Sequence, residues 1–591
     1  MTPRVKYAEV FADWLVELGY THCFFVAGGN IMHLLDGVRT RMTCVATVHE
    51  VAAGLAAEAF NATGNEGRAF AMVTAGPGLT NITTALASAY LDRRELLVVG
   101  GQVKSSDLAT NGLRQRGIQE IDGIALAGPT CVATLRIEQP VARSVIVEVI
   151  AAGAGADPGP VFIEMCLDAQ GAPVDEVALS AGAPAVEIVD AAIAGAATDI
   201  VSRLAVAERP VIVVGGAVSR AAADAALPAL ERLGVPVMTT WTGVDRIPSD
   251  CTVYAGRPDT WGQRAANLAL AQADLIVAIG VRLGLQETGF NWQEYGLGGD
   301  VVQVYPDPAE LQKGHPEVAA AHCADASAVL AAALSVAAWT DSLGWFDYVQ
   351  QVRSLLPVID AANATAEGFA CPFRFAQRLS ELATAEDVIT ICSSGGANSV
   401  PMQVFQVKRG QSVMVDSGLA SMGVGLGHAI GAAFGNAGRR VLHIEGDGGF
   451  CQNLQELAII DVNQLPIKMM IWANDGYGSI RTTQRNYFDG AYLGCDTQTG
   501  LGFPDWEQLF AAFHIPCTTL GPAGLDDPSA AAGLASSGPH AFIVPVDPEQ
   551  TYWPKITSRV TESGSMESNP LYRMSPAIAE DIEAAVTKYL A

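Results

Sequence analysis

The sequence predicts an α/β protein built from three doubly wound parallel-sheet domains. Short apolar runs rich in β-branched residues alternate with longer, Ala-rich amphipathic segments, which is the pattern of parallel strands joined by helices. At about 150 residues per domain, a chain of 591 residues has room for three to four domains. The alternation is interrupted at about 169–191 and 340–372, so we expect the domains at 1–180, 190–340 and 365–591.

The apolar runs also give the order of the expected strands. No short-period repeat is visible, and a shared topology of the first and third domains stays open. The third domain is expected to end in a polar tail from about Trp553. The expected strands are 22–27, 69–74, 96–101 and 161–164 in the first domain, 210–215, 275–280 and 301–305 in the second, and 387–392, 440–445, 467–473 and 541–546 in the third.

Composition narrows the class of protein. The 62 acidic residues outnumber the 35 basic ones and give a net charge of −27, with no basic patch, so we expect neither nucleic acid nor a membrane as a partner. The 11 cysteines are scattered without zinc spacing and are expected to be reduced thiols. The N-terminus lacks the apolar stretch of a signal peptide, and no run of about 18 apolar residues occurs. A cytoplasmic enzyme is therefore the expected class.

The segment 441–481 carries the strongest chemical pattern. An expected strand runs into Gly446-Asp447-Gly448-Gly449, which we expect to open a helix that continues through Leu457, and the next strand ends at Asn474. Glycines let backbone N–H groups approach phosphate oxygens, and Asp and Asn supply the oxygen ligands that Mg²⁺ prefers. Because parallel strands end at one edge of a sheet, Asp447 and Asn474 are expected to lie close together. A lone Gly-Asp-Gly, in contrast, is an ordinary turn.

The whole arrangement resembles a known motif. A strand, Gly-Asp-Gly, and an Asn-x-Gly-Tyr-Gly sequence 27 positions later are similar to the thiamine diphosphate and Mg²⁺ motif of the thiamine-dependent enzymes. The resemblance implies that the metal ligands are Asp447, Asn474 and the backbone carbonyl of Gly476. It also implies that Gly446, Gly448, Gly449 and Tyr477 lie against the cofactor.

A second element lies near the N-terminus. Val48-His49-Glu50, an expected helix over 51–60, and Gly76-Pro77-Gly78-Leu79-Thr80-Asn81 resemble the HE…GPGxxN pattern of the acetolactate synthase and pyruvate oxidase branch. By this resemblance Glu50 hydrogen-bonds N1′ of the cofactor's aminopyrimidine and so tunes a base that belongs to the cofactor. Pro77 and Asn81 are expected beside it. The alternative for Glu50 is a surface acid at a helix start, stabilised by the helix dipole.

Weaker elements fit the same resemblance. The loop 25–30 is similar to the first Gly-rich loop beside the pyrimidine, which implies catalytic positions for Gly29 and Asn30, and Gln119 matches a Gln that faces the substrate. Met422 matches the apolar residue that wedges under the cofactor, although Met is more often a filler of core gaps. The turn at Gly395 and Gly396 is expected to be a second contact of the diphosphate.

Whether the middle domain binds a flavin stays open from the sequence. It looks like the central domain of the same family, which holds FAD in acetolactate synthases and pyruvate oxidases. Gly215, Gly216 and Arg282 stand where FAD-binding members carry comparable residues. Gly-Gly after a strand is also an ordinary tight turn, and Asp307, where many members have an acid, does not settle whether FAD binds.

The resemblance covers essentially the whole chain and is closest to the large catalytic subunit of acetolactate synthase. It implies decarboxylation of a 2-oxo acid, with pyruvate as the expected donor, and transfer of the acyl unit to a carbonyl acceptor. Thr483 and Gln286 stand where branched-chain acetolactate synthases place a Trp and an Arg, and the tail resembles enzymes of polysaccharide and branched-sugar pathways. A larger acceptor, or one without a carboxylate, is expected. The alternative is a decarboxylase or oxidase that does not ligate.

Two other classes of function predict different features of the sequence. A non-catalytic homologue is expected to have lost Glu50 or the metal pair, and this chain retains them. A dinucleotide oxidoreductase is expected to carry GxGxxG after a strand, and none stands there. Because Glu50 and Asp447 lie in different domains, the family resemblance places the cofactor between the first domain of one subunit and the third domain of another. A homodimer or homotetramer is therefore expected.

Overall fold

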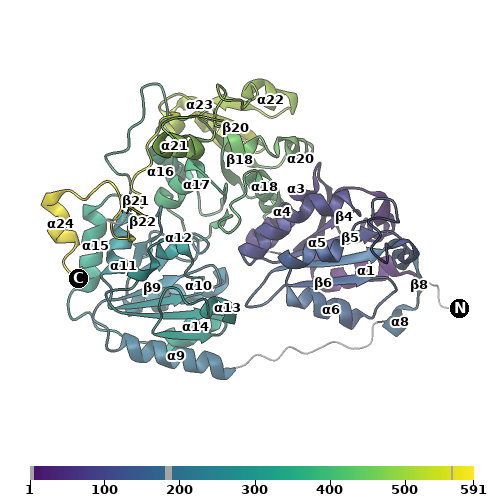
Figure 1. The fold of residues 1–591 in the computed structure, drawn as a ribbon, viewed down its shortest axis with the longest axis horizontal. Coiled ribbons are helices and arrows are strands. Elements are labelled where there is room, and N and C mark those ends of the chain that lie inside the picture. The colour runs from purple at the N-terminus through teal and green to yellow at the C-terminus, as the bar shows by residue number, and fades with distance from the viewer. Residues whose placement is uncertain (1–4, 65, 180–189, 561–563, 591) are drawn as a thin grey trace.

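The computed structural model describes residues 5–64, 66–179, 190–560 and 564–590. They form three parallel six-stranded sheets flanked by helices, which confirms the expected fold class (Figure 1). The first sheet has the order β3 (Thr43–Ala46), β2 (Tyr20–Phe25), β4 (Arg68–Val73), β5 (Leu96–Gln102), β7 (Pro160–Cys166) and β6 (Ala133–Ile137). The middle sheet has the order β11 (Tyr254–Gly256), β10 (Val237–Thr239), β9 (Pro210–Val214), β12 (Leu275–Ile279), β13 (Asp300–Tyr305) and β14 (Ala320–Cys323). The third has the order β16 (Ser412–Val415), β15 (Val388–Ile391), β17 (Val441–Gly446), β18 (Ile467–Ala473), β20 (His540–Pro545) and β19 (Cys517–Thr519).

The strand orders answer the question of topology. Counted along the chain within each domain, the first and third sheets both have the order 2-1-3-4-6-5, so these two domains share a topology. The middle sheet has the order 3-2-1-4-5-6, the doubly wound order in which dinucleotides bind where the strand order reverses. That reversal lies between β9 and β12.

Helices connect the strands of each domain. The first domain contains α1 (Tyr7–Glu17), α2 (Met32–Val38), α3 (Glu50–Thr63), α4 (Pro77–Leu91), α5 (Gly123–Ala127), α6 (Arg143–Ala152), α7 (Leu167–Gly171) and α8 (Glu176–Leu179), with β1 (Val5–Lys6) paired to β8 (Pro173–Val174). The middle domain contains α9 (Asp190–Leu204), α10 (Arg220–Leu233), α11 (Arg264–Ala271), α12 (Leu285–Thr288), α13 (Pro308–Leu311), α14 (Ala326–Val336) and α15 (Trp345–Leu355). The third contains α16 (Pro372–Leu382), α17 (Gly396–Val404), α18 (Val424–Gly435), α19 (Asp447–Phe450), α20 (Leu457–Asn463), α21 (Gly478–Tyr487), α22 (Trp506–Ala512) and α23 (Pro528–Ala535).

All the expected strands are present within a few residues, but the sequence missed seven more in the three sheets. The missed strands are short or carry polar residues, as in β14 and β19, which lie at sheet edges. The expected continuous helix through Leu457 was wrong. Helix α19 stops at Phe450, a 3₁₀ turn covers Leu454–Glu456, and α20 follows. The break occurs at Asn453, which has the non-helical dihedrals φ −136° and ψ 24° and whose side chain donates a hydrogen bond to the carbonyl of Gly423.

Helices α3 and α18 join the first and third domains. One apolar cluster runs from α3 and β4 into α18 and β17. A Cβ placed on Gly427, Gly431 or Gly435 would meet Leu55, Ala56 or Phe60 respectively, so residue numbers rise together along both helices and the pair is parallel. Since each helix returns antiparallel to its strands, the carboxyl edges of the first and third sheets point the same way.

A buried polar network crosses the same junction. Glu58 on α3 accepts hydrogen bonds from Arg94 (2.9 Å) and Ser88 (3.4 Å), and its carboxylate lies 3.3 Å from Nε2 of His428 on α18. The Ser88 hydroxyl also lies 3.3 Å from Asp416, so its single proton is shared between the two carboxylates. Burying an ionic network is tolerated only when its members satisfy one another, so this network fixes how the two domains pack.

The close helix approach leads to a prediction about Gly431. Its Cβ would overlap the backbone of Ala56, which cannot move without shifting α3. We expect Gly431→Ala to lower the free energy of unfolding by about 1–3 kcal/mol and to lower the melting temperature. The matched control is Gly195→Ala in α9, where a Cβ meets nothing within 4 Å and alanine favours the helix. Thermal unfolding of both variants checks the prediction, and an unchanged Gly431→Ala protein would contradict it.

The tail returns to the middle domain. After the strands β21 (Ser558–Val560) and β22 (Met566–Ser568), helix α24 (Glu580–Val586) ends where Gln272 donates to the carbonyl of Val586 at 3.0 Å. Val586 is buried against residues of the middle domain. The segment 340–372, expected to be a break, contains α15, which packs in the same place. Within the described ranges, no helix combines the length and apolar character needed to cross a membrane.

Candidate cofactor site

A cavity of about 270 Å³ lies at the carboxyl ends of β15, β17 and β18 in the third domain. This is the edge of a parallel sheet where α/β folds bind ligands. The cavity brings together all the residues of this domain that the sequence predicted for the site: Gly395, Gly396, Met422, Gly446, Asp447, Gly448, Gly449, Asn474, Gly476 and Tyr477.

Three oxygen-bearing groups converge at the cavity wall. Asp447 is 2% exposed, and its carboxylate accepts hydrogen bonds from the backbone N–H of Gly448 (2.7 Å) and of Asn474 (2.9 Å). The end of the Asn474 amide that faces them lies 2.8 Å from the carbonyl oxygen of Gly476 and 3.1 Å from Oδ1 of Asp447. With its NH₂ on that side the amide would donate to both, whereas with its oxygen there three oxygens converge with no proton between them, which is the arrangement that a cation needs. One carboxylate, one amide and one carbonyl within these distances form an oxygen donor set that fits Mg²⁺.

Burial raises the pKa of Asp447 to about 7, although backbone N–H groups oppose the rise. A carboxylate that loses its contact with water needs a positively charged partner to stay ionised near neutral pH. Within the described residues no cluster of three or more His, Cys, Asp or Glu side chains forms an alternative metal site. The donor set around Asp447 consists of oxygens without a thiolate or an imidazole, which suits a hard cation such as Mg²⁺.

Glycines keep the cavity open. A Cβ on Gly448 would overlap the ring of Tyr477, and one on Gly396 would overlap the ring of Tyr552. Gly395 has φ +72°, a conformation that a glycine adopts without strain. The turn before α17 and the turn before α19 thus bring backbone to the cavity without side chains in the way, as a bound diphosphate requires.

Met422 stands at the wall of this cavity, just before α18. Its side chain is 37% exposed, so it does not fill a gap in the core. This is the position that a wedge under a cofactor needs, although its role stays a prediction. The sequence missed Tyr552, Ser479 and Ile480, which also line the cavity. Tyr552 comes from the tail, more than 70 positions beyond the motif, and has no local signal.

The first domain holds the other predicted residues. Glu50 is the first residue of α3 and is 8% exposed, and Nδ2 of Asn81 donates to its Oε2 at 2.9 Å. Glu50 is therefore not a surface acid. Just before it, the N–H groups of Val48 and His49 donate to Glu456 of the third domain, at 3.2 and 2.9 Å. The sequence did not assign a role to Glu456.

The remaining first-domain residues gather at the carboxyl ends of β2, β4 and β5. The N–H of Asn30 donates to Oγ1 of Thr74 at 3.3 Å. Gly76, with φ +64°, precedes Pro77 at the start of α4, and a Cβ on Gly76 would overlap the carbonyl of Gln119. Gly29 opens a 3₁₀ turn over Gly29–Ile31 in the same loop. The fold thus brings Gly29, Asn30, Pro77 and Gln119 to one edge of the first sheet.

These two sets of residues do not share the cavity. All the lining residues of the 270 Å³ cavity belong to the third domain and its tail, and none of the first domain's predicted residues is among them. The parallel packing of α3 and α18 explains this, because the carboxyl edges of the two sheets lie side by side and do not face each other.

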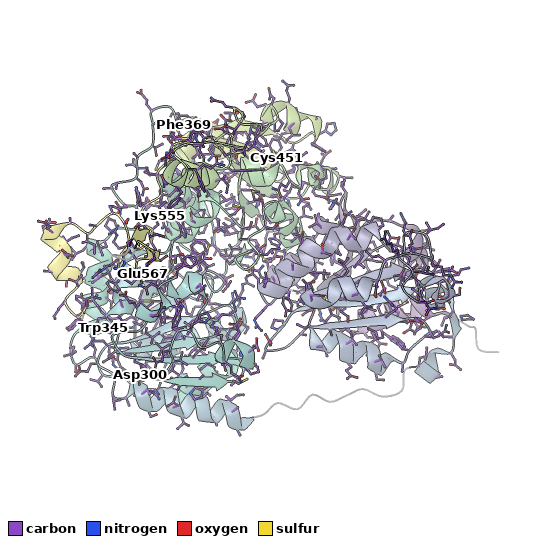
Figure 2. The ribbon with its side chains drawn as sticks, viewed as in Figure 1. Asp300, Trp345, Phe369, Cys451, Lys555 and Glu567 are labelled. Atoms are coloured by element: carbon purple, nitrogen blue, oxygen red, sulfur yellow. The ribbon has the colours of Figure 1, made fainter. Side chains whose placement is uncertain are left out.

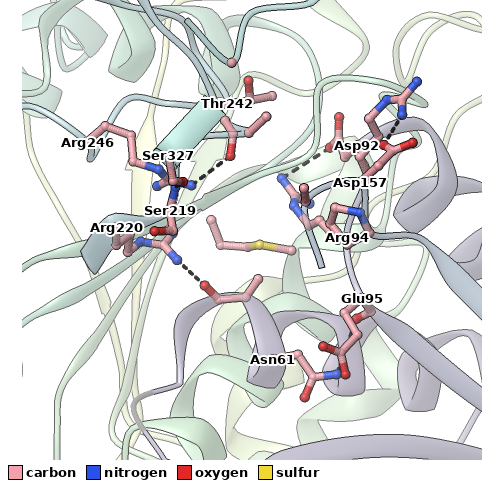
Figure 3. A pocket seen from close by; sticks show the side chains of 18 of the residues that line it. Asn61, Asp92, Arg94, Glu95, Asp157, Ser219, Arg220, Thr242, Arg246 and Ser327 are labelled. Atoms are coloured by element: carbon pink, nitrogen blue, oxygen red, sulfur yellow. Dashed lines mark hydrogen bonds and ion pairs between the residues drawn. The ribbon is translucent and has the colours of Figure 1, made fainter. Parts of the chain in front are cut away.

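A larger cavity of about 790 Å³ lies where the three domains meet (Figure 3). The middle domain contributes Gly216 after β9 and Gly280 after β12, so the cavity opens at the point where the strand order reverses. Figure 3 shows Arg220 and Arg246 of the middle domain on one side and Arg94 of the first domain on the other. Five arginines and five carboxylates line it, so its size and its arginine side chains, and not a net positive charge, suit a phosphate-bearing dinucleotide.

The predicted FAD positions lie around this larger cavity. Gly216 and Arg282 line it, and Gly215 packs against Gly280. Asp307 forms an ion pair with Arg93, which also pairs with Asp157 and lies over the ring of Tyr305. Asp307 is therefore already engaged at the rim. The residues present fit a dinucleotide, and whether FAD occupies the cavity stays a prediction.

The two departures from branched-chain acetolactate synthases differ in their surroundings. Thr483 is exposed on α21, and its hydroxyl donates to the carbonyl of Ser479 at 3.0 Å. Gln286 donates from Nε2 to Asp259 at 3.4 Å. Asp259 also accepts hydrogen bonds from the N–H of Trp261 (3.0 Å) and the hydroxyl of Thr260 (3.2 Å).

Asp259 leads to a prediction about pH. Burial raises the pKa of Asp259 from 3.8 to about 8, and the nearby Glu287 carboxylate adds to the rise. Between about pH 4 and 8 the folded chain holds a proton that the unfolded chain has released, so the stability of the wild type falls as the pH rises through this window. Each pKa unit corresponds to about 1.4 kcal/mol. Asp259→Asn keeps an acceptor oxygen but does not titrate. We expect it to be more stable than the wild type by several kcal/mol at pH 8.5 and by much less at pH 4.5.

Thermal unfolding at the two pH values measures this difference. Asp250→Asn, at an exposed position of the same domain, serves as the control and should show no pH-dependent gain. A gain of the same size for Asp259→Asn at both pH values would show that the titration of Asp259 is not its cause.

Comparison with known protein families matches all three domains. Residues 5–126 match the thiamine pyrophosphate enzyme, N-terminal TPP binding domain; residues 197–333 match the central domain; and residues 393–541 match the C-terminal TPP binding domain. The matched segments include Glu50 in the first domain, Gly216 in the middle domain and Asp447 in the third domain.

Relatives extend over the same length. The chain is 29% identical to acetolactate synthase isozyme 2 large subunit of Escherichia coli (strain K12), over 94% of this chain and 99% of that protein. It is 27% identical to the chloroplastic acetolactate synthase 1 of Oryza sativa subsp. japonica, over 94% and 87%. It is 28% identical to the probable acetolactate synthase large subunit of Methanocaldococcus jannaschii, over 92% and 93%. With three domain matches in the order of the three sheets, the chain belongs to the thiamine pyrophosphate enzyme family.

Proposed function

We propose that the protein is a thiamine diphosphate- and Mg²⁺-dependent carboligase of the acetolactate synthase type. It would decarboxylate a 2-oxo acid, with pyruvate as the proposed donor, and transfer the acyl unit to a carbonyl acceptor. The observation that carries the proposal is the cavity in which Asp447, Asn474 and the carbonyl of Gly476 converge beside the glycine turns. The acetolactate synthase relatives that match over almost the whole chain support it.

The residues of this chain have separate tasks in the proposal. Thiamine diphosphate, when bound, supplies the electron sink for the electron pair that stays on the substrate when CO₂ departs. Asp447, Asn474 and Gly476 would hold Mg²⁺ against the diphosphate, and the N–H groups of the turn at 446–449 would contact its oxygens. Glu50, oriented by Asn81, would hold a proton at N1′ of the pyrimidine. Met422 would support the bend of the cofactor from below.

We propose a homodimer as the smallest active unit, with a tetramer as a further assembly. The cavity for the diphosphate is lined only by the third domain and tail among the described residues, while Glu50 lies on α3 of the first domain. Since the carboxyl edges of the two sheets point the same way within one chain, a cofactor that bridges two such edges needs the first domain of a second copy. The exposed apolar side chains of Met32, Val48 and Ile480 support such an interface.

We also propose that FAD binds in the 790 Å³ cavity. Gly216 and Arg282 would lie against its diphosphate, at the edge where the strand order reverses. The absorption spectrum of the purified protein and the flavin released on denaturation test this directly. A cytoplasmic location is proposed as well, because the 11 cysteines are all free thiols.

The central test uses purified protein with thiamine diphosphate, Mg²⁺ and pyruvate, with Glu50→Gln alongside. CO₂ release is followed, and the carbon product is identified by mass spectrometry and NMR. Acetolactate, or a ligated product when an aldehyde is added, supports the carboligase. Acetaldehyde or acetate would make the protein a decarboxylase or an oxidase instead. If neither CO₂ nor any product forms, the proposed function is wrong.

A further inference from the structure

Two segments lead away from the cofactor cavity toward the middle domain. Helix α21 begins beside the cavity, where Ser479 and Ile480 line it. The tail segment begins at Tyr552, which lines the cavity too, and runs on to Ile556, whose N–H donates to the carbonyl of Thr260 in the middle domain at 3.0 Å. Figure 2 places Lys555 at this junction, between the third domain and the middle domain.

Lys555 is held between two indole rings. Its ammonium nitrogen lies 4.9 Å from the ring centre of Trp261 and 5.0 Å from that of Trp553. Among the residues that the structure describes, no carboxylate lies within 4.0 Å of it and no hydrogen bond engages it. Burial lowers the pKa of Lys555, and the nearby charge of Arg485 lowers it further. Among the described residues its three N–H donors therefore have no protein acceptor, although the side chain is half-buried.

Arg485 adds a second positive charge. It lies one helical turn after Arg481 on α21, and both arginines pair with Glu549, Arg481 at 2.8 Å. Arg481 also pairs with Asp496 at 3.2 Å. The two arginines are thus balanced by Glu549 and Asp496, and the ammonium of Lys555 adds a positive charge without an ion pair at this edge, in a protein whose net charge is −27. A local excess of positive charge beside the cofactor cavity attracts an anionic substrate group.

We propose that Lys555 binds a phosphoryl group on the carbonyl acceptor and so selects phosphorylated acceptors. Lys555 and Arg485 repel each other, and a doubly charged group between them removes that repulsion, which a neutral hydroxyl does not. An ammonium presents three donors to phosphate oxygens. The two indole faces exclude water from one side of the group and strengthen its interaction with the ammonium. The proposal rests on the carboligase function, because the acceptor is defined by that reaction.

The test compares two acceptors that differ only in charge. Glyceraldehyde and glyceraldehyde 3-phosphate are each offered with pyruvate, thiamine diphosphate and Mg²⁺. For the wild type we expect kcat/KM to be at least about ten-fold higher with the phosphorylated acceptor. Lys555→Met keeps an apolar stem between the indole rings and should raise KM for glyceraldehyde 3-phosphate about 10- to 100-fold. It should leave kcat/KM for glyceraldehyde unchanged, and likewise the rate of CO₂ release without an acceptor. Lys555→Arg should keep most of the preference for the phosphorylated acceptor.

Lys588→Met is the matched control. Lys588 also lies over an aromatic ring, 4.6 Å from the centre of Tyr589, but at the end of the chain and away from the cofactor cavity. Lys588→Met should change kcat/KM for neither acceptor. A measurement that needs no variant is the effect of salt, which should raise KM for the phosphorylated acceptor of the wild type and not for glyceraldehyde.

Each outcome decides between a binding role and a structural one. The proposal is overturned if Lys555→Met loses kcat/KM equally with both acceptors. It is also overturned if the wild type has nearly the same kcat/KM for glyceraldehyde and for glyceraldehyde 3-phosphate. A lysine that only holds the tail between the indole rings would not distinguish acceptors by their charge. A wild type that releases no CO₂ from pyruvate contradicts the proposed function itself. Normal CO₂ release without the preference contradicts only the role of Lys555.

Discussion

Glu50→Gln is expected to lower pyruvate decarboxylation by about 100- to 10,000-fold while leaving the affinity for thiamine diphosphate nearly unchanged. Glutamine keeps the size of the side chain and an oxygen that accepts the hydrogen bond from Asn81. It loses the negative charge that would hold a proton at N1′ of the pyrimidine. Since the metal donors all lie in the third domain, binding of the diphosphate does not depend on Glu50.

The measurement pairs turnover with cofactor titration. CO₂ release gives the rate, and calorimetric titration with thiamine diphosphate in Mg²⁺ gives the affinity. Glu66→Gln, an exposed acid in the same domain, should match the wild type in both. A Glu50→Gln protein that loses affinity as much as rate would show that Glu50 contributes to binding and not to proton handling.

The third-domain site was predictable from the sequence because its parts are local. Asp447 and Asn474 each follow a buried strand, and β17 and β18 are neighbours in the sheet, so a pattern of 27 residues fixes their meeting. Glu50 was predictable for another reason, because Val48-His49-Glu50 and the segment 76–81 together resemble a family pattern, although strand β3 before it was missed. The alternation of apolar runs sufficed for the central strands, which are buried on both faces.

The features that the sequence did not predict depend on tertiary contacts, which produce no periodic pattern of residues. Tyr552 and Lys555 reach the cofactor cavity and its edge through an irregular tail, whose residues follow no helix or strand pattern. The short edge strands β14 and β19 are specified by their neighbours and not by their own composition. The helix break at Asn453 results from a side-chain bond to Gly423, which is 30 positions away. The large cavity needs all three domains at once.

Asp447→Ala is expected to abolish Mg²⁺-dependent binding of thiamine diphosphate, with a rise in Kd of at least about 100-fold. The substitution removes the one carboxylate of the donor set, so the cation loses its only charged ligand there. Burial already raises the pKa of this carboxyl to about 7, and its removal relieves an unfavourable buried charge. We therefore expect the melting temperature without cofactor to stay near that of the wild type, and Asp447→Asn, which keeps an acceptor oxygen, to show the same loss of binding.

Titration with thiamine diphosphate at several Mg²⁺ concentrations measures the effect. Asp475→Asn is the control, because it removes an exposed carboxylate in the same loop, directly before Gly476. Asparagine also accepts the φ of +57° at this position. That control should bind cofactor like the wild type. If Asp447→Ala retained Mg²⁺-dependent binding, the donor set proposed around Asp447 would be wrong.

The two variants together test where the active site lies. If Glu50 and Asp447 serve one site from different subunits, a mixed dimer of Glu50→Gln and Asp447→Ala chains has one site with both changes and one site with neither. Co-expression at equal amounts makes about half of the dimers mixed, so about a quarter of the wild-type sites should return. If both residues served a site within one chain, every site of the mixed dimer would carry one defect and no activity would return. The parallel packing of α3 and α18, which turns both sheet edges the same way, favours the first result.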